Sequence, residues 1–446
     1  MGRFRFAVQS ENGVYKQEFP PVSGFHPNGS FRPTAPAVLP DAFNEMEKET
    51  IIMKKFFALV MAVLMVAAMF AGCGSSNSAA QTTAAAADAP AAGNTVKIGM
   101  SGPLTGGASA YGLAVKAGME VAVEEINAKG GLQIEFNAQD DEADGEKAVS
   151  AYNALKDWGM QVMAGQVTTG AALAVAPEST ADNIFNLTPS ASAEALALSG
   201  ANIFQMCFTD PNQGASAAEL VSAKSLGTKV GVIYDSSDDY STGLYNGFKA
   251  KAEELGVEIV ATTSFTADNK ADLSTQVTQC QDAGADLVFL PIYYTEAAQI
   301  LTYANRIGYA PKFFGCDGMD GILTVEGFDT SLAEGLALMT PFDANATDEA
   351  TQSFVAKFKE KMDGLVPNQF AADGYDVIYA LYDAMTAAGI TGNESASEIC
   401  EALKTQFATM SVDGLTGSGM HWDENGMISK APAAVVVENG VYVPMA

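Results

Sequence analysis

The stretch that decides the fold is residues 96–131, VKIGMSGPLTGGASAYGLAVKAGMEVAVEEINAKGG. It begins with a short β-rich run, passes through a turn that contains Gly and Pro, and continues as a long segment with helical spacing. Leu113, Ala117 and Val121 recur at the interval that places apolar side chains on one face of a helix. Gly130 and the glycine after it end that pattern. The stretch therefore predicts one strand followed by one helix.

The same alternation continues along the chain. Short β-rich runs, such as 229–235 (KVGVIYD) and 286–292 (DLVFLPI), stand between longer segments with helical spacing. The other expected helices are 144–158, 213–226, 241–255, 270–283, 295–307, 347–363, 369–388 and 395–408. Strands that are apolar almost throughout and alternate with helices are typical of parallel sheets covered on both faces. The predicted fold class is α/β with doubly wound parallel sheets.

In such sheets, ligands bind beyond the carboxyl ends of the strands, where loops lead into helix N-termini. The loops after the expected strands carry hydroxyls, aromatic rings and single acids, as in QVTTGAA, TPSASAEAL, YYTEAA and CDGMDG. Ser and Thr are also favoured as simple helix N-caps, and a tyrosine or an aspartate in a loop is often a packing or capping residue. The residues alone leave both interpretations open.

The sequence argues against several function classes. It contains no GxGxxG, GxSxG, HExxH or GxxxxGK[ST] motif, and His421 is the only histidine after residue 72. Carboxylates alone can catalyse reactions, but no pair of acids stands out from the acidic background. The net charge of −29 would repel nucleic acid. We expect a protein that is not an enzyme, with no cofactor, no bound metal and no nucleic-acid partner.

In order and spacing, the loops resemble the leucine/isoleucine/valine-type binding proteins that serve ABC importers. The matching segments are GPLTG and INAKGG within 96–131, VTTGAALA, TPSASAEAL, DSSDDYSTG, LPIYYTEAA and HWDENGM. The resemblance covers roughly residues 96–443 and implies the type I periplasmic binding protein fold, with two lobes joined by three hinge crossovers. A disulfide that staples the first lobe in several members has no Cys counterparts here.

The resemblance implies that the first lobe comprises 96–211 and 342–418, and the second lobe 212–341 and 419–446. Crossovers are expected near 210–212, 339–342 and 418–422. Closure of the lobes would trap a small ligand between them.

In the first lobe, the resemblance implies that Thr168 and Thr169, chiefly Thr169, bind the α-carboxylate of an amino acid. Ala191 and Ser192, with Ser190 beside them, would contact the amino-acid backbone through a carbonyl and a hydroxyl. Hydroxyls and free N–H groups at a helix start do stabilise a carboxylate.

In the second lobe, the resemblance assigns Asp317 to the α-ammonium group and Tyr240 to the ligand. Tyr293 or Tyr294 would also face the ligand, and the residues do not say which. Tyr111 would line the mouth. An acid opposite an ammonium group in a water-free cleft interacts more strongly than at a surface.

The pattern does not determine which residues line the pocket for the ligand's side chain. The candidates are Val167, Gln166, Tyr111 and Phe370. The family also includes binders of amides, urea and aromatic acids, so the resemblance alone does not determine the ligand class. Asp317 favours a ligand with an α-ammonium group. A ligand-sensing extracellular receptor would share the same site.

The segment MKKFFALVMAVLMVAAMFAGC predicts a lipoprotein signal peptide at 53–72 and a lipidated Cys73. A transmembrane helix is the alternative, but the apolar run is short for one. FAGC resembles a lipobox, with Phe70 where an aliphatic residue is usual. Residues 1–52 are expected to be upstream sequence that is not translated, or else a disordered extension, and 73–95 a flexible linker.

These features predict a monomer held by its lipid on the outer face of a bacterial cell membrane, with ABC permease and ATPase subunits as partners. Cys207, Cys280, Cys316 and Cys400 show no CxxC spacing, so a zinc site is not expected. The sequence does not decide whether any of the four forms a disulfide.

Overall fold

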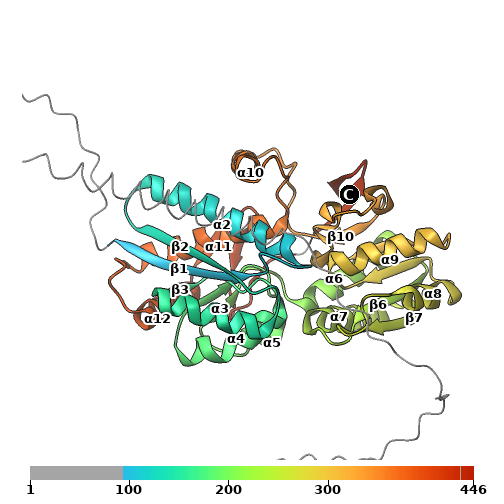
Figure 1. Cartoon of the computed structure of the whole chain (residues 1–446), viewed down its shortest axis with the longest axis horizontal. Helices are drawn as coiled ribbons and strands as arrows, with labels where there is room; N and C mark the ends of the chain where they lie inside the picture. Colours follow the sequence, from blue (N-terminus) through green and yellow to red (C-terminus); the bar gives the residue numbers. More distant parts are fainter. Residues whose placement is uncertain (1–93, 432, 446) are drawn as a thin grey trace, which may run out of the picture. The chain divides into compact units, whose positions relative to one another are not determined.

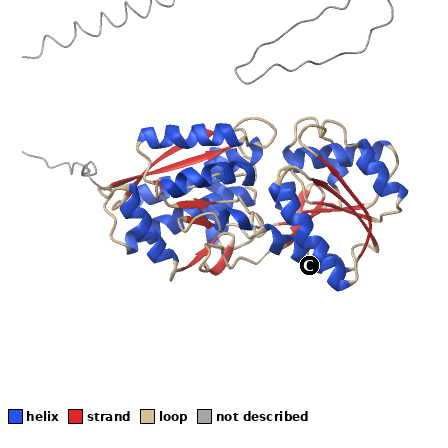
Figure 2. Cartoon of the chain, turned by 90° about the horizontal axis from the view of Figure 1, so that it is seen from below, coloured by secondary structure: helices blue, strands red, loops and turns tan. Residues whose placement is uncertain are grey.

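The computed structural model describes residues 94–431 and 433–445 (Figure 1). The expected signal peptide, lipidated Cys73 and upstream 52 residues lie outside the described part. The described residues form two mainly parallel sheets and a separate two-stranded antiparallel hairpin. Figure 2 shows helices flanking the strands of both sheets. The predicted fold class, α/β with doubly wound sheets, is confirmed.

The first sheet has five parallel strands in the order β2-β1-β3-β4-β5. Its strands are β1 (Thr95–Gly102), β2 (Gln133–Asp140), β3 (Val162–Met163), β4 (Asn186–Thr188) and β5 (Ile203–Gln205). The helices that accompany it are α2 (Ser109–Lys129), α3 (Gly145–Trp158), α4 (Thr169–Ala181), α5 (Glu194–Ala197), α10 (Glu349–Lys361), α11 (Gln369–Ala387) and α12 (Ala396–Phe407). The strand and helix expected in 96–131 are β1 and α2.

The second sheet has the order β14-β13-β10-β9-β8-β6-β7. Its strands are β6 (Lys229–Asp235), β7 (Glu258–Phe265), β8 (Leu287–Leu290), β9 (Lys312–Gly315), β10 (Ala337–Met339), β13 (Ala434–Glu438) and β14 (Val441–Pro444). Its helices are α6 (Asp210–Lys224), α7 (Asp239–Leu255), α8 (Ser274–Asp282) and α9 (Tyr294–Arg306), with 3-10 turns η2 (Asp317–Met319), η3 (Ile322–Thr324) and η4 (Thr330–Ala333). The sheet is parallel except at one edge, where β13 runs antiparallel to β10 and β14.

Burial explains why the strands were readable from sequence. All four residues of β8 are buried, so its run of apolar residues has no polar face.

The two helices α2 and α11 meet closely because glycines stand at their crossing. A Cβ on Gly118 would lie 1.9 Å from the carbonyl oxygen of Ala371, and one on Gly374 2.6 Å from that of Val115.

Two further observations concern the described part of the chain. Cys207, Cys280, Cys316 and Cys400 are all buried and free, so none of them forms a disulfide. Within 94–431 and 433–445, no helix has the length and apolar character that crossing a membrane requires.

The chain passes between the two sheets three times. The first passage lies between β5 and α6, and the second between β10 and α10. The third passage was expected at 418–422 but occurs later in the chain. Trp422 donates from Nε1 to the Gln205 carbonyl at 2.8 Å, and Gln205 N donates to the Gly426 carbonyl at 2.9 Å. The ring of Trp422 also packs 4.4 Å from that of Phe407, so this segment stays with the first sheet and crosses only before β13.

A buried ion pair lies just before this third passage. Lys430 donates to Asp373 Oδ1 and to Thr416 Oγ1, both at 2.6 Å. Asp376 accepts from the hydroxyl and backbone N–H of the same threonine. The side chains of Lys430 and Asp373 are 1% and 2% exposed, so each charge depends on the other for compensation. The pair ties the end of the first-sheet segment to α11.

We expect Lys430→Met to lower the free energy of unfolding by about 3–5 kcal/mol, because it leaves Asp373 buried without a cation. Urea titration followed by circular dichroism measures this loss.

The matched control is Lys404→Met, which removes a pairing with the exposed Glu401. That change should cost less than about 1 kcal/mol. Equal losses in the two variants would contradict a structural role for the buried pair.

Candidate functional site

Loops from both sheets meet at one small cavity. It is lined by Tyr111, Val167, Thr168, Thr169, Ser190, Tyr240, Tyr293, Asp317, Gly318 and Phe370. Most of them follow the carboxyl ends of parallel strands: β1, β3 and β4 in the first sheet, and β6, β8 and β9 in the second. Seven of the ten predicted ligand residues are in this set.

The first-sheet side of the cavity is the N-terminus of α4. Thr168 is the N-cap, but its hydroxyl makes no capping bond and has no hydrogen-bond partner. Thr169 Oγ1 accepts from Ser192 N at 3.2 Å, and Ser190 Oγ donates to the Val167 carbonyl at 2.7 Å. The first N–H groups of a helix have no partner within it. This end of the cavity therefore suits an anion.

The second-sheet side holds one carboxylate, Asp317, which is 2% exposed. It follows β9 and begins the turn η2. Its Oδ1 accepts from the Tyr240 hydroxyl at 2.6 Å and from Gly318 N at 2.9 Å. Burial raises the pKa of Asp317, while the hydrogen bonds from Tyr240 and Gly318 partly oppose that rise. Burial and the charge of Asp317 together raise the pKa of Tyr240 well above its usual value.

Aromatic rings fill the space between these two ends. The rings of Tyr111 and Phe370 lie 4.5 Å apart, and those of Tyr240 and Tyr293 stack at 5.0 Å. The Tyr111 hydroxyl donates to the Gly318 carbonyl, which joins the first sheet's α2 to the second sheet's η2. The remaining cavity is about 20 Å³, close to the room that one water needs. In this closed arrangement, a ligand would have to displace the rings or part the lobes.

Three predicted ligand residues do not line the cavity. Ala191 and Ser192 are fully buried, and the Ala191 carbonyl accepts from Gln205 Nε2 at 2.8 Å. Tyr294 turns away, because its hydroxyl accepts from Ala110 N at 3.1 Å. Tyr293 is thus the tyrosine of the pair that faces the cavity. Of the candidates for the side-chain pocket, Val167 and Phe370 line the cavity whereas Gln166 does not.

Two residues at the site were missed by sequence reasoning. A Cβ on Gly318 would lie 2.6 Å from the Tyr240 hydroxyl, so only glycine fits between Asp317 and that ring. Gln213 Oε1 accepts from Asp317 N at 2.9 Å and so holds the aspartate backbone in place. The glycine in CDG was a visible signal, whereas nothing near Gln213 in the sequence pointed to Asp317.

The charges of the cavity are unbalanced. Among the described residues that line it, Asp317 is an acid and none is Lys, Arg or His. The described chain also contains no group of three or more His, Cys, Asp or Glu residues placed to hold a metal ion. A helix N-terminus opposite a buried carboxylate can hold a small molecule with a negative end and a positive end.

Further acids are buried close to this one. Burial raises the pKa of Asp320 to about 7, and the charges of Asp317 and Asp373 add to the rise. Burial likewise raises the pKa of Asp373 to about 6, although Lys430 opposes it. These groups bind protons more tightly in the folded chain than in the unfolded one.

Comparison with known proteins gives a consistent result. A family model described as "Periplasmic binding protein" matches residues 95–440. The Leu/Ile/Val-binding protein homolog 3 of Brucella melitensis is 29% identical over 308 residues, which cover 68% of this chain and 81% of that protein.

Two solved structures have a similar fold and were determined with different ligands. The branched-chain amino acid substrate-binding protein LivJ of Streptococcus pneumoniae, in complex with isoleucine, has a TM-score of 0.70 and 27% identity, covering 78% of this chain and 97% of its own. A solute-binding protein of Rhodopseudomonas palustris, in complex with 3,4-dihydroxybenzoic acid, has a TM-score of 0.70 and 21% identity, covering 79% and 96%. The second likeness shows the fold alone.

We expect the stability of the protein to fall as the pH rises from about 4 to about 7. Asp320 has a raised pKa in the folded state, so its stabilising contribution is complete below the unfolded pKa and is lost as the pH rises through about 7. In Asp320→Asn this loss should be absent, which flattens the slope of unfolding free energy against pH by up to roughly 1.4 kcal/mol per pH unit.

Urea titrations at several pH values measure the slope. Asp268→Asn, at an exposed acid, is the control and should keep the wild-type slope. An Asp320→Asn protein with that same slope would rule out a raised pKa at Asp320.

Proposed function

The chain belongs to the periplasmic binding protein family, and on this premise we propose that it captures a small α-amino acid between its two lobes. The proposed ligand is branched-chain or similar in its side chain. The proposed role is that of the extracytoplasmic binding protein of an ABC importer, which delivers the ligand to the permease. Relatives and structural neighbours of the chain are binding proteins whose names include leucine, isoleucine and valine.

One observation carries the choice of ligand: the buried Asp317 and the α4 N-terminus line the same cavity, and none of the described residues that line it is Lys, Arg or His. A zwitterion meets both ends, with its carboxylate at Thr168 and Thr169 and its ammonium group at Asp317. The ammonium group would supply the positive charge that Asp317 lacks, and charge-assisted hydrogen bonds of this kind are the stronger ones. The rings of Tyr111 and Phe370 would enclose an apolar side chain.

The binding free energy that the ligand requires is modest. Micromolar binding corresponds to about −8 kcal/mol. Each charge-assisted hydrogen bond contributes roughly 1.5–3 kcal/mol, and burial of a leucine-sized side chain roughly 1.5–3 kcal/mol. Two charged ends and one apolar side chain are therefore sufficient, with the cost of lost ligand freedom set against them.

Aromatic acids are the main alternative, because the Rhodopseudomonas palustris neighbour was solved with one. A ligand of that class has a carboxylate and no ammonium group. It would leave Asp317 buried and unpaired, and leaving a buried charge without a partner is costly. Amides and urea would lack the full charge at one or both ends. The cleft therefore favours an α-amino acid over these classes.

A ligand-sensing receptor remains the second candidate role, since it would use the same cleft. The two roles differ in what the closed form contacts, a permease or a receptor. We also propose that Cys73 carries a lipid that holds the protein at the outer face of the membrane, where it acts as a monomer. The three passages between the sheets are the proposed hinges.

We expect Asp317→Asn to weaken leucine binding by about 100-fold, because the ammonium group loses its charged partner. Thr169→Ala should weaken it by about tenfold through loss of one hydrogen bond to the carboxylate. Isothermal titration calorimetry measures both changes. Asp268→Asn, at an exposed acid outside the cleft, is the matched control and should bind like the wild type.

4-Methylpentanoate, which is leucine without its ammonium group, separates the ligand classes. The wild type should not bind it measurably, whereas Asp317→Asn should lose that discrimination. Tight binding of 4-methylpentanoate or benzoate to the wild type would favour an acid binder and overturn the proposal.

A further inference from the structure

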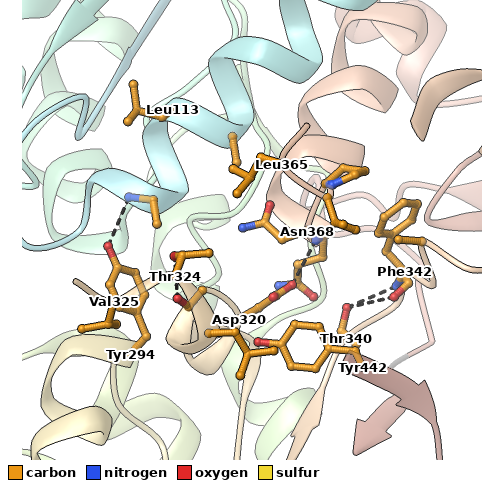
Figure 3. Close-up of a pocket in the computed structure, with 18 of the residues that line it drawn as sticks. Leu113, Tyr294, Asp320, Thr324, Val325, Thr340, Phe342, Leu365, Asn368 and Tyr442 are labelled. Atoms are coloured by element: carbon orange, nitrogen blue, oxygen red, sulfur yellow. Dashed lines mark hydrogen bonds between the residues drawn. The ribbon is translucent and has the colours of Figure 1, made fainter. Parts of the chain in front are cut away.

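Figure 3 shows a second, larger cavity. Its volume is about 740 Å³, within the range of small-molecule sites. Tyr294 forms part of its wall, and the ring of Tyr294 packs 4.8 Å from that of Tyr111 in the cleft. The two cavities are therefore neighbours that share an aromatic partition.

The rim of this cavity is apolar and exposed. Six large hydrophobic side chains are exposed in the described part of the chain, and Leu113, Leu365, Val366 and Val441 are four of them. All four line this cavity. Leu113 belongs to the apolar face expected for α2, yet it is 40% exposed. Apolar side chains gathered in this way around a hollow mark a binding surface.

The charge of the cavity is entirely negative. Asp320, Glu326 and Asp343 line it, and none of the described residues that line it is Lys, Arg or His. Asp320 is 3% exposed and accepts from Gln369 N at Oδ2, at 3.0 Å. The Tyr442 hydroxyl also interacts with this carboxyl group, but Asp320 Oδ1 has no hydrogen-bond partner of good geometry.

Gln369 adds a second oxygen without a donor. Its side chain is buried, and Oε1 has no hydrogen-bond partner. Figure 3 shows Asp320, Thr324 and Tyr442 opposite Leu113 and Leu365. One side of the cavity is thus acidic and rich in acceptors, and the other is aliphatic. The rings of Tyr294 and Tyr442 add faces that attract cations.

We propose that this cavity binds an amphipathic organic cation, an ammonium group carried on an apolar or aromatic body, at a site separate from the amino-acid cleft. The ammonium group lies at the Asp320 and Gln369 side, and the apolar body lies against Leu113 and Leu365. Leu113 comes from α2 of the first sheet and Tyr442 from β14 of the second. The bound cation therefore bridges the two lobes and stabilises their closed arrangement.

The probe is (4-bromobenzyl)trimethylammonium, titrated by calorimetry into the protein without any amino acid present, at a pH well above 7, where Asp320 is ionised. Asp320→Asn should weaken its binding at least tenfold, because the charge that attracts the cation is removed. Leu365→Lys should also weaken it at least tenfold by placing a positive charge at the rim. Leu365 is 44% exposed, so this change leaves the core intact.

Leu198→Lys is the matched control, since Leu198 is 60% exposed and does not line the cavity. It should bind the probe like the wild type. Neutral 4-bromobenzyl alcohol should bind the wild type at least tenfold more weakly than the cation. Equal binding by all variants, or equal binding of the alcohol, overturns the proposal.

The bromine atom also locates the probe directly. In a crystal soaked with it, the anomalous signal should lie between Leu365 and Tyr442. A signal confined to the cleft between Tyr111 and Tyr240, or no signal at all, overturns the proposal. Neither result bears on amino-acid binding, because the cleft is tested separately with Asp317→Asn.

Discussion

Asp317, a buried carboxylate with no basic partner among the described residues, is the constraint on which the rest of the account depends. It is held from three directions, by Tyr240, Gly318 and Gln213, so its position is fixed before any ligand arrives. Closing the lobes around it without a cation is costly, because burial penalises the charged form. A ligand with an ammonium group removes that cost. Closure and ligand capture are then one event, since the charge that makes the closed cleft unfavourable is the charge that the ligand neutralises.

The two sheets contribute different chemical groups to ligand recognition. The first offers hydroxyls and the free N–H groups of α4, and the second offers the acid. Neither half holds both ends of a zwitterion, so affinity depends on the lobes coming together. The contact from Tyr111 to Gly318 and the bond from Gln369 to Asp320 join the halves in the structure. The larger cavity lies across the same junction, so an occupant there would favour the closed form too and, by linkage, would strengthen ligand binding in the cleft.

Much of the fold was readable from sequence, because buried parallel strands such as β8 are continuous apolar runs. The helix α4 was absent from the expected helix ranges, although Thr168 and Thr169 were placed at a helix start; its sequence contains Gly170 and Pro177, which are unfavourable inside a helix. The third passage was placed too early, because only the packing of Trp422 shows which lobe holds it. Most of the site residues were predicted from the resemblance of the loops to those of leucine/isoleucine/valine-type binding proteins. The sequence could not decide between Tyr293 and Tyr294, because the choice depends on a hydrogen bond to Ala110, far away in the chain. The larger cavity left no local sequence pattern, since its lining comes from many separate segments of the chain.

The most direct test of the central claim is a crystal structure of the protein grown with leucine. The account predicts leucine between the lobes, with its ammonium nitrogen within about 2.7–2.9 Å of the Asp317 carboxylate. Its carboxylate should lie against the N-terminus of α4, at Thr168 and Thr169. Leucine bound with its ammonium group away from Asp317, or seated outside the cleft, would contradict the account.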